Sequence, residues 1–129
     1  MKMAIAVVHM TLRVSGLLLI LLGLTFWTGH ALQLIPVHET LGFVLVLSLW
    51  TLAFFAARAG VATGWVVLAV VWGLVAPILG LAQERLLTGD WHWTIQVLHL
   101  LIGLGAIGQG EGLVVRMRRR AASEQMRAA

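Results

Sequence analysis

Cysteine is absent from this chain of 129 residues, and only 11% of the residues are charged. Without thiols the chain cannot form disulfides, thiolate zinc sites, iron–sulfur clusters, covalent c-type haem attachments or cysteine nucleophiles. The scarcity of charge excludes a soluble monomer, because an ordinary soluble domain is about 25% charged. Disorder is excluded as well, because 60% of the residues are hydrophobic. The mean hydropathy of +0.98 predicts a domain that lies mostly in lipid.

Four apolar runs are each long enough to cross a bilayer, which takes about 20 residues per helix. They cover residues 4–29, 37–57, 61–82 and 93–115. The links between them are short, and short links make consecutive helices antiparallel neighbours. The sequence therefore predicts an all-α, up-down four-helix bundle in the membrane over residues 1–115. A basic tail, 116–129, follows it as a frayed helix end.

Both prolines of the chain fall at informative places in these runs. Pro36 suits the first turn of the second helix, where its missing N–H is not needed. Pro77 lies inside the third run and predicts a kink or a distorted final turn there.

Lysine and arginine are distributed unequally between the two ends of the predicted bundle. Only Arg85 falls at one end, whereas the other end holds Lys2, Arg13, Arg58, Arg116, Arg118, Arg119, Arg120 and Arg127. By the positive-inside rule, both termini are expected in the cytoplasm. The outer face then carries Glu39, Glu84 and Asp90, with Trp27, Trp91 and Trp93 as interface anchors. Arg13 is close enough to its helix end to snorkel outward.

The sequence pI of about 11.5 is high enough to raise the question of nucleic-acid binding. The position of the charges argues against it, because the arginines of residues 116–120 directly follow the last span. A cluster there sets the topology and attracts anionic lipid, at about 1 kcal/mol per charge. Docking of a cytoplasmic partner is the alternative role for this cluster.

The first run has a second interpretation, as a cleaved signal peptide. Lys2 and Arg13 precede an apolar stretch, and Gly29-His30-Ala31 is a small-x-small triplet. The apolar run is at the upper limit for a signal core, which favours a retained helix.

Ionisable residues at depth in a membrane are functional candidates, and four of the five histidines fall near the outer face. These four are His30, His38, His92 and His99. Only His9 lies near the cytoplasmic end, and it has no histidine partner there, so we expect it to be an interfacial residue.

His38 and His99 share one local pattern, because each has a glycine four residues later, Gly42 and Gly103. Residues i and i+4 share a helix face, which leaves room beside each imidazole for something flat and bulky. This arrangement suits a b-type haem held by two axial histidines in an apolar slot. The alternative is that both are ordinary interfacial histidines, with glycines that serve helix packing.

Two neighbours are candidate contacts of a bound haem. Gln96 lies on nearly the same face as His99 and could hydrogen-bond a ligand or a propionate. Arg85, the only outer cation, could pair with a propionate, although pairing with Glu84 or Asp90 or simple exposure is the alternative.

A divalent metal is the main rival for this site. The outer histidines, together with Glu39, Glu84 and Asp90, could supply three or four ligands for zinc or copper. No HxxH, HxxxH or HExxH spacing supports it. His30 also remains open as a replacement for one of the two haem ligands.

The string from Gly103 to Gly108 matches GxGxxG, but that motif binds dinucleotides only between a strand and a helix. Here it lies within a predicted spanning helix. Close approach of another helix or a cofactor is expected instead at Gly103, Gly105, Gly108, Gly110 and Gly112, and at Gly16 and Gly23 on the first helix.

Two segments resemble a known family. LIPVHETLGFVLVLSLWTLAFFAAR resembles the second helix of small bacterial membrane cytochromes of the cytochrome b561 type, and VLHLLIGLGAIG resembles a haem-ligating helix of the same group. The resemblance covers about 40 residues and implies a four-helix cytochrome b that exchanges electrons with a quinone or another redox partner. His38 and His99 match the family's ligands. That family commonly carries two haems, whereas this chain offers one convincing pair, near the outer face.

Three hypotheses follow. The first is an electron-carrying haem b protein of the bacterial inner membrane, acting alone, as a homodimer or within a larger redox complex, and an oxidoreductase if it is an enzyme. The second is a membrane assembly or packing subunit without a cofactor. The third is a divalent-metal-binding membrane protein.

Overall fold

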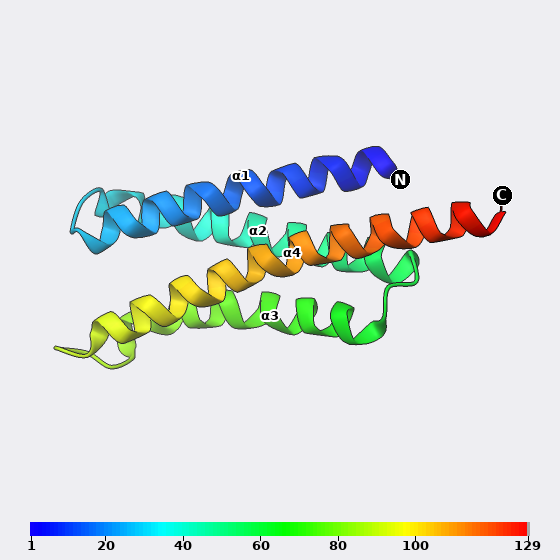
Figure 1. Ribbon diagram of the computed structural model, residues 1–129. Coiled ribbons are helices and arrows are strands. Elements are labelled where there is room, and N and C mark those ends of the chain that lie inside the picture. Colours follow the sequence, from blue (N-terminus) through cyan, green and yellow to red (C-terminus); the bar gives the residue numbers. More distant parts are fainter. Residues whose placement is uncertain (129) are drawn as a thin grey trace.

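Four long helices make up this chain in the computed structural model, which describes residues 1–128 (Figure 1). The helices are α1 (Lys2–Trp27), α2 (Ile35–Arg58), α3 (Thr63–Ala82) and α4 (His92–Ala128). Single 3-10 turns, η1 (Leu32–Leu34) and η2 (Gln83–Arg85), lie in two of the links. Residues 1–128 contain no β-strand. The predicted all-α four-helix fold is confirmed, and each helix is long and apolar enough to cross a membrane.

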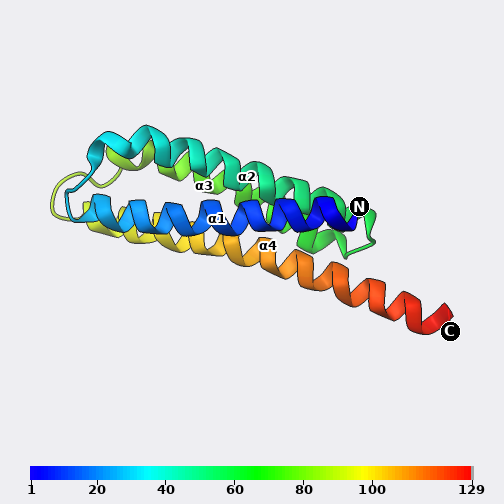
Figure 2. The same cartoon turned by 90° about the horizontal axis from the view of Figure 1, so that it is seen from above.

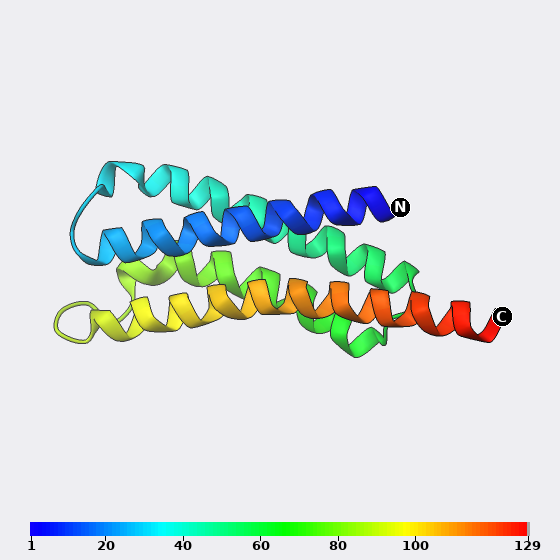
Figure 3. The same cartoon turned by 45° about the horizontal axis from the view of Figure 1, so that its top comes forward.

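The helices run up and down, so that the bundle has two distinct ends. The termini end holds the N-terminus and the 59–62 link, and the loop end holds the 28–34 and 83–91 links (Figure 1). Figure 3 shows α1 crossing in front of α2, with α4 in front of α3. Both α2 and α4 pack against all three other helices. Residues from every helix can therefore meet in the bundle interior.

Local sequence explains where the helices begin and end. Pro36 lies in the first turn of α2, as predicted. Gly29 and Gly60 follow the ends of α1 and α2 with positive φ angles of 77° and 69°, which glycine adopts without strain. The α-helix continues through Pro77 to Ala82 and then tightens into the 3-10 turn η2.

The tail differs from the expected frayed end. Residues 116–128 continue α4 without a break, and this segment projects past the other helices in Figure 2. Its alanine, arginine, glutamate and methionine residues are strong helix formers, so the helix persists where it leaves the bundle.

Close packing of the bundle depends on large side chains that rest on glycines of a neighbouring helix. Trp72 of α3 packs onto Gly105 of α4 and donates its indole N–H to the Ile102 carbonyl at 2.8 Å. The same arrangement pairs Trp50 with Gly73, Leu12 with Gly110 and Ile107 with Gly16. The predicted close approach is thus found at Gly16, Gly105 and Gly110, and Gly23 has the His38 ring in ordinary contact distance. Gly103 and Gly108 instead face open space, and Gly112 meets only Arg116 of its own helix.

The best-packed part of the core lies away from the loop end. Its fully buried large side chains are Leu12, Leu49, Leu52 and Leu113. They fill the interior between α1, α2 and α4. The loop end is packed differently, and it holds most of the histidines.

Candidate functional site

A cavity of about 370 Å³ lies among the four helices at the loop end. Its volume falls in the range of small-molecule sites, roughly 300–1,000 Å³. Side chains from all four helices line it, and most of them are apolar. Where the other end of the bundle is filled by leucines, this end leaves room for a ligand.

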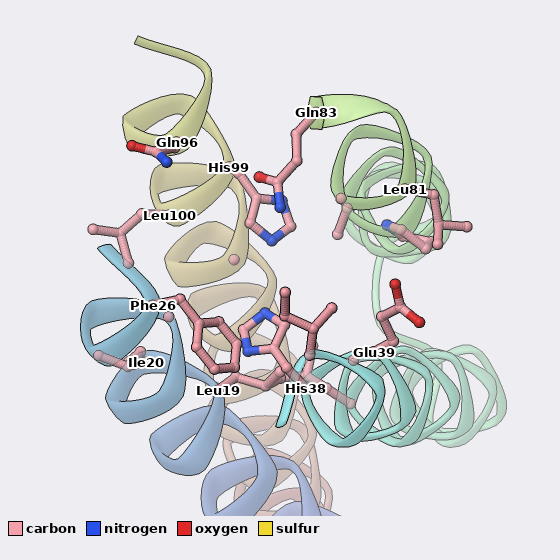
Figure 4. Close-up of a pocket in the computed structure, with 18 of the residues that line it drawn as sticks. Leu19, Ile20, Phe26, His38, Glu39, Leu81, Gln83, Gln96, His99 and Leu100 are labelled. Atoms are coloured by element: carbon pink, nitrogen blue, oxygen red, sulfur yellow. The ribbon is translucent and has the colours of Figure 1, made fainter. Parts of the chain in front are cut away.

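His38 of α2 and His99 of α4 extend into this cavity from different helices and face each other (Figure 4). Their ring centroids are 6.3 Å apart, and the ring planes are inclined by 50°. Two imidazoles on opposite sides of one metal ion, with bonds of about 2 Å, place their centroids roughly 6.3 Å apart. The separation of the two rings therefore matches that of two ligands on opposite sides of one metal centre.

Neither ring is held by a hydrogen bond at Nδ1. In both His38 and His99 this nitrogen is buried and has no hydrogen-bond partner within the described chain. A buried polar atom without a partner costs free energy and is rare in native proteins. Two such atoms in facing rings indicate a site whose polar groups are completed by a ligand.

Contacts from α1 and α3 fix where the two rings lie. Phe26 meets the His38 ring edge-on, with centroids 5.4 Å apart, and Gly23 lies behind it, so that a Cβ there would be 3.6 Å from Cε1. A Cβ on Gly80 would be only 2.9 Å from Cε1 of His99. Gly80 is therefore needed for the His99 ring to occupy its place.

Sequence reasoning missed Phe26 and Gly80 as parts of this site. The available signal was the spacing of Gly73 and Gly80, seven residues apart on α3, which places both on one helix face. That spacing does not say which neighbour each glycine receives.

The predicted open space next to the histidines is present. Gly42 and Gly103 both line the cavity. A Cβ added at either position would meet no atom within 4 Å. The structure thus brings together four of the predicted site residues, His38, His99, Gly42 and Gly103, around one cavity.

The polar neighbours are arranged differently from the expectation. Gln96 is half-buried and lines the cavity. Arg85 is exposed and does not line it, whereas its neighbours Gln83 and Glu84 do. Figure 4 shows the Gln83 side chain reaching toward His99 and Glu39 rising beside His38. The polar part of the cavity is therefore formed by amides and carboxylates rather than by Arg85.

The remaining loop-end histidines have local partners. His30 is exposed, does not line the cavity, and places Nδ1 3.0 Å from Oγ1 of Thr28. His92 lines the cavity, and its Nδ1 is 3.3 Å from the carbonyl oxygen of Leu86. His30 is thus not positioned to replace His38 or His99.

A divalent site of three or four protein ligands is not formed. Across residues 1–128, no three histidine, aspartate or glutamate side chains gather closely enough to hold a metal ion. A haem needs only two protein ligands, because its macrocycle supplies the others. The geometry therefore favours the two-ligand site over the zinc or copper alternative.

A second polar cluster lies toward the termini end and joins α1 to α4. Glu111 accepts hydrogen bonds from His9 Nε2 at 2.8 Å, from Arg13 Nε at 2.6 Å and from Arg13 Nη2 at 2.8 Å. His9 is only 7% exposed, so its imidazole lies inside the bundle rather than on its surface. Arg13, which was predicted to snorkel outward, is exposed and also pairs with Glu111 of the neighbouring helix α4. Glu111 was not recognised from the sequence.

Comparisons with protein-family models, curated proteins and solved structures found no match to this chain. Function is therefore inferred from the geometry of the site and the properties of its side chains. The similarity to cytochromes of the b561 type stays a prediction.

Proposed function

We propose that this chain is an integral membrane protein that binds one b-type haem between His38 and His99 and carries electrons. The observation that carries the proposal is the pair of facing imidazoles, 6.3 Å apart and each with an unpartnered buried Nδ1. Imidazole is a common axial ligand of haem iron. When bound, the haem supplies the one-electron redox chemistry.

The side chains around the pair support the proposal in two further ways. An apolar slot is available between Leu19, Ile20 and Leu100, which line the cavity with the two glycines. Apolar walls exclude water, which lowers the local dielectric and tunes a redox potential. Gln83 and Gln96 provide amide groups at the rim that can hydrogen-bond propionates.

The chain's own contribution is ligation and orientation. Phe26 and Gly23 hold the His38 ring from the α1 side, and Gly80 admits the His99 ring from the α3 side. Because both rings are fixed by packing, little reorganisation accompanies a change in charge at the centre. A rigid, dry environment of this kind suits electron transfer.

The membrane arrangement we propose has both termini in the cytoplasm and the haem near the outer face of a bacterial inner membrane. The lysine and arginine distribution supports this orientation. Trp27, Trp91 and Trp93 are all exposed near the loop end, as expected of interface anchors. Electrons would pass to or from a quinone or a redox partner, with the chain acting alone, as a homodimer or as a subunit of a larger complex.

The decisive experiment is a visible absorption spectrum, oxidised and reduced, of protein produced with ample haem. We expect a Soret band that shifts on reduction in the wild type, and its loss in the double variant His38→Ala, His99→Ala. The matched control, His9→Ala, His30→Ala, removes two histidines that do not line the cavity and should keep the band. Absence of the Soret band from the wild type, or its persistence in the variant His38→Ala, His99→Ala, would refute the proposal. Haem-free protein that co-purifies with a larger complex would instead identify an assembly subunit.

A further inference from the structure

A second cavity, of about 270 Å³, lies at the termini end of the bundle. Its lining comes from the 59–62 link, the first turn of α3 and α4: Val61, Ala62, Trp65, Arg116, Arg119 and Arg120. Half of these residues are arginines, and no acidic residue is among them. The cavity is independent of the histidine site and has no role in the proposed function.

The helical spacing of the arginines explains why they share this cavity. Arg116 and Arg120 are four residues apart, and Arg119 is three from Arg116, so all three lie on one face of α4. The Arg116 guanidinium stacks 3.6 Å from the centre of the Trp65 ring. It also donates from Nη1 to the Gly112 carbonyl at 2.9 Å. Arg116 is therefore held in place, with donors left over.

Charge in this cavity is uncompensated by the protein. Among the residues that the structure describes, the only ion pairs are those of Glu111 with His9 and Arg13. Helix α3 begins beside the arginines with no side-chain cap and no acidic residue in its first turn. Its N-terminal dipole adds to the positive potential. Three guanidinium groups around one cavity repel each other, and an anion between them removes that repulsion.

We infer that this cavity binds the phosphate group of an anionic phospholipid. Guanidinium groups recognise phosphate through paired, charge-assisted hydrogen bonds. A lipid rather than free phosphate is favoured because exposed apolar side chains neighbour the site: Val115 directly precedes Arg116 on α4, and Leu68 lies one turn after Trp65 on the same face of α3. Trp65, 42% exposed, combines an apolar ring with a polar N–H, as residues at a membrane interface do.

The test is native mass spectrometry of the full-length protein, released from detergent, with phosphatidylglycerol or phosphatidylcholine added. We expect a phosphatidylglycerol adduct in the wild type and its loss in the variant Arg116→Gln, Arg119→Gln, Arg120→Gln. Because each charge-assisted hydrogen bond from a guanidinium group to phosphate contributes about tenfold or more, binding should weaken by more than about 100-fold. The control Lys2→Gln, Arg118→Gln, Arg127→Gln removes the same charge outside the cavity and should weaken binding far less.

Equal weakening in both triple variants would overturn the site in favour of delocalised attraction. Equal binding of the two lipids to the wild type would overturn the selection of an anionic lipid. Inorganic phosphate that competes as well as phosphatidylglycerol would overturn the lipid as occupant. If the triple variant loses helical circular dichroism, the single variants Arg119→Gln and Arg118→Gln decide. They are adjacent on α4, and only Arg119 lines the cavity.

Discussion

Histidines at the two ends of the bundle differ in whether a side chain of the protein satisfies their ring nitrogens. At the termini end, His9 is paired with Glu111 at 2.8 Å, and Glu111 is also held by Arg13. At the loop end, His38 and His99 face each other across a cavity, and Nδ1 of each has no partner in the described chain. Both groups lie on helices that are long and apolar enough to cross a membrane, but only the second leaves polar atoms without a hydrogen-bond partner in the described chain.

This contrast distinguishes His9, whose imidazole has a partner within the protein, from His38 and His99, whose Nδ1 atoms have none in the described chain. An ionisable group within a membrane bundle is a functional candidate by default, but a group whose hydrogen bonds are satisfied within the protein already has a reason to be there. The Glu111 cluster ties α1 to α4. His38 and His99 do not hydrogen-bond each other through Nδ1. Their rings are positioned by contacts with Phe26 and Gly23 of α1 and with Gly80 of α3.

The largest expected effect comes from single substitutions of the histidines. His38→Ala or His99→Ala should each weaken haem binding by more than about 100-fold, since loss even of an outer-shell partner costs 10–100-fold at a metal site. His9→Ala should leave haem occupancy unchanged, because its partner Glu111 does not line the cavity. Haem titration followed by absorbance measures all three. Loss of haem in His9→Ala would erase the contrast between the two ends.

A smaller effect is expected from filling the space beside the pair. Gly103→Leu places a side chain in the cavity and should weaken haem binding by about an order of magnitude. Gly108→Leu is the matched control, because both glycines lie on α4 with nothing within 4 Å of a Cβ, and only Gly103 lines the cavity. The same titration compares them. Equal affinities in the two variants would show that the haem does not occupy this space.

The paired cluster should affect stability rather than haem. Glu111→Ala leaves the buried His9 imidazole without its partner, which costs about 1–3 kcal/mol. Denaturation in mixed micelles, followed by circular dichroism, measures the free energy of unfolding. Glu124→Ala, at an exposed position of α4, serves as the control and should be near neutral. A Glu111→Ala protein of unchanged stability would mean that the cluster is not a structural tie.

The smallest effect is expected at the rim of the cavity. Gln96→Leu removes an amide that can hydrogen-bond a propionate or ligand, and haem affinity should fall by only about threefold. Gln109→Leu, also half-buried on α4 but outside the cavity lining, should not change it. Competition with apomyoglobin resolves differences of this size. A loss in Gln96→Leu as large as that in His99→Ala would make Gln96 a primary contact.

Much of the fold follows from local sequence. The lengths of the apolar runs predicted four helices, and the structure places Pro36 in the first turn of α2 as expected. Glycines four residues after His38 and His99 predicted open space, and the structure has it. These predictions succeed because length, periodicity and i, i+4 spacing are properties of a single helix.

The roles of residues that face a different helix were beyond such reasoning. The support of His99 by Gly80 depends on the rotation of α3 against α4, and the placement of Gln83 rather than Arg85 at the cavity depends on how η2 turns. Neither the rotation of α3 nor the path of η2 is encoded in a spacing along one helix. Packing between helices, such as that of Trp72 onto Gly105, determines how α3 lies against α4.

By itself, the sequence determined that this protein has four helices long and apolar enough to cross a membrane, and that most of its histidines gather at one end. Only the tertiary structure decided which histidines are free to bind a ligand. His9 meets its partner 102 residues away along the chain, and the packing of the helices leaves Nδ1 of His38 and His99 without any partner among the described residues. A hydrogen bond forms between atoms about 3 Å apart in space, and distance along a chain does not report that proximity.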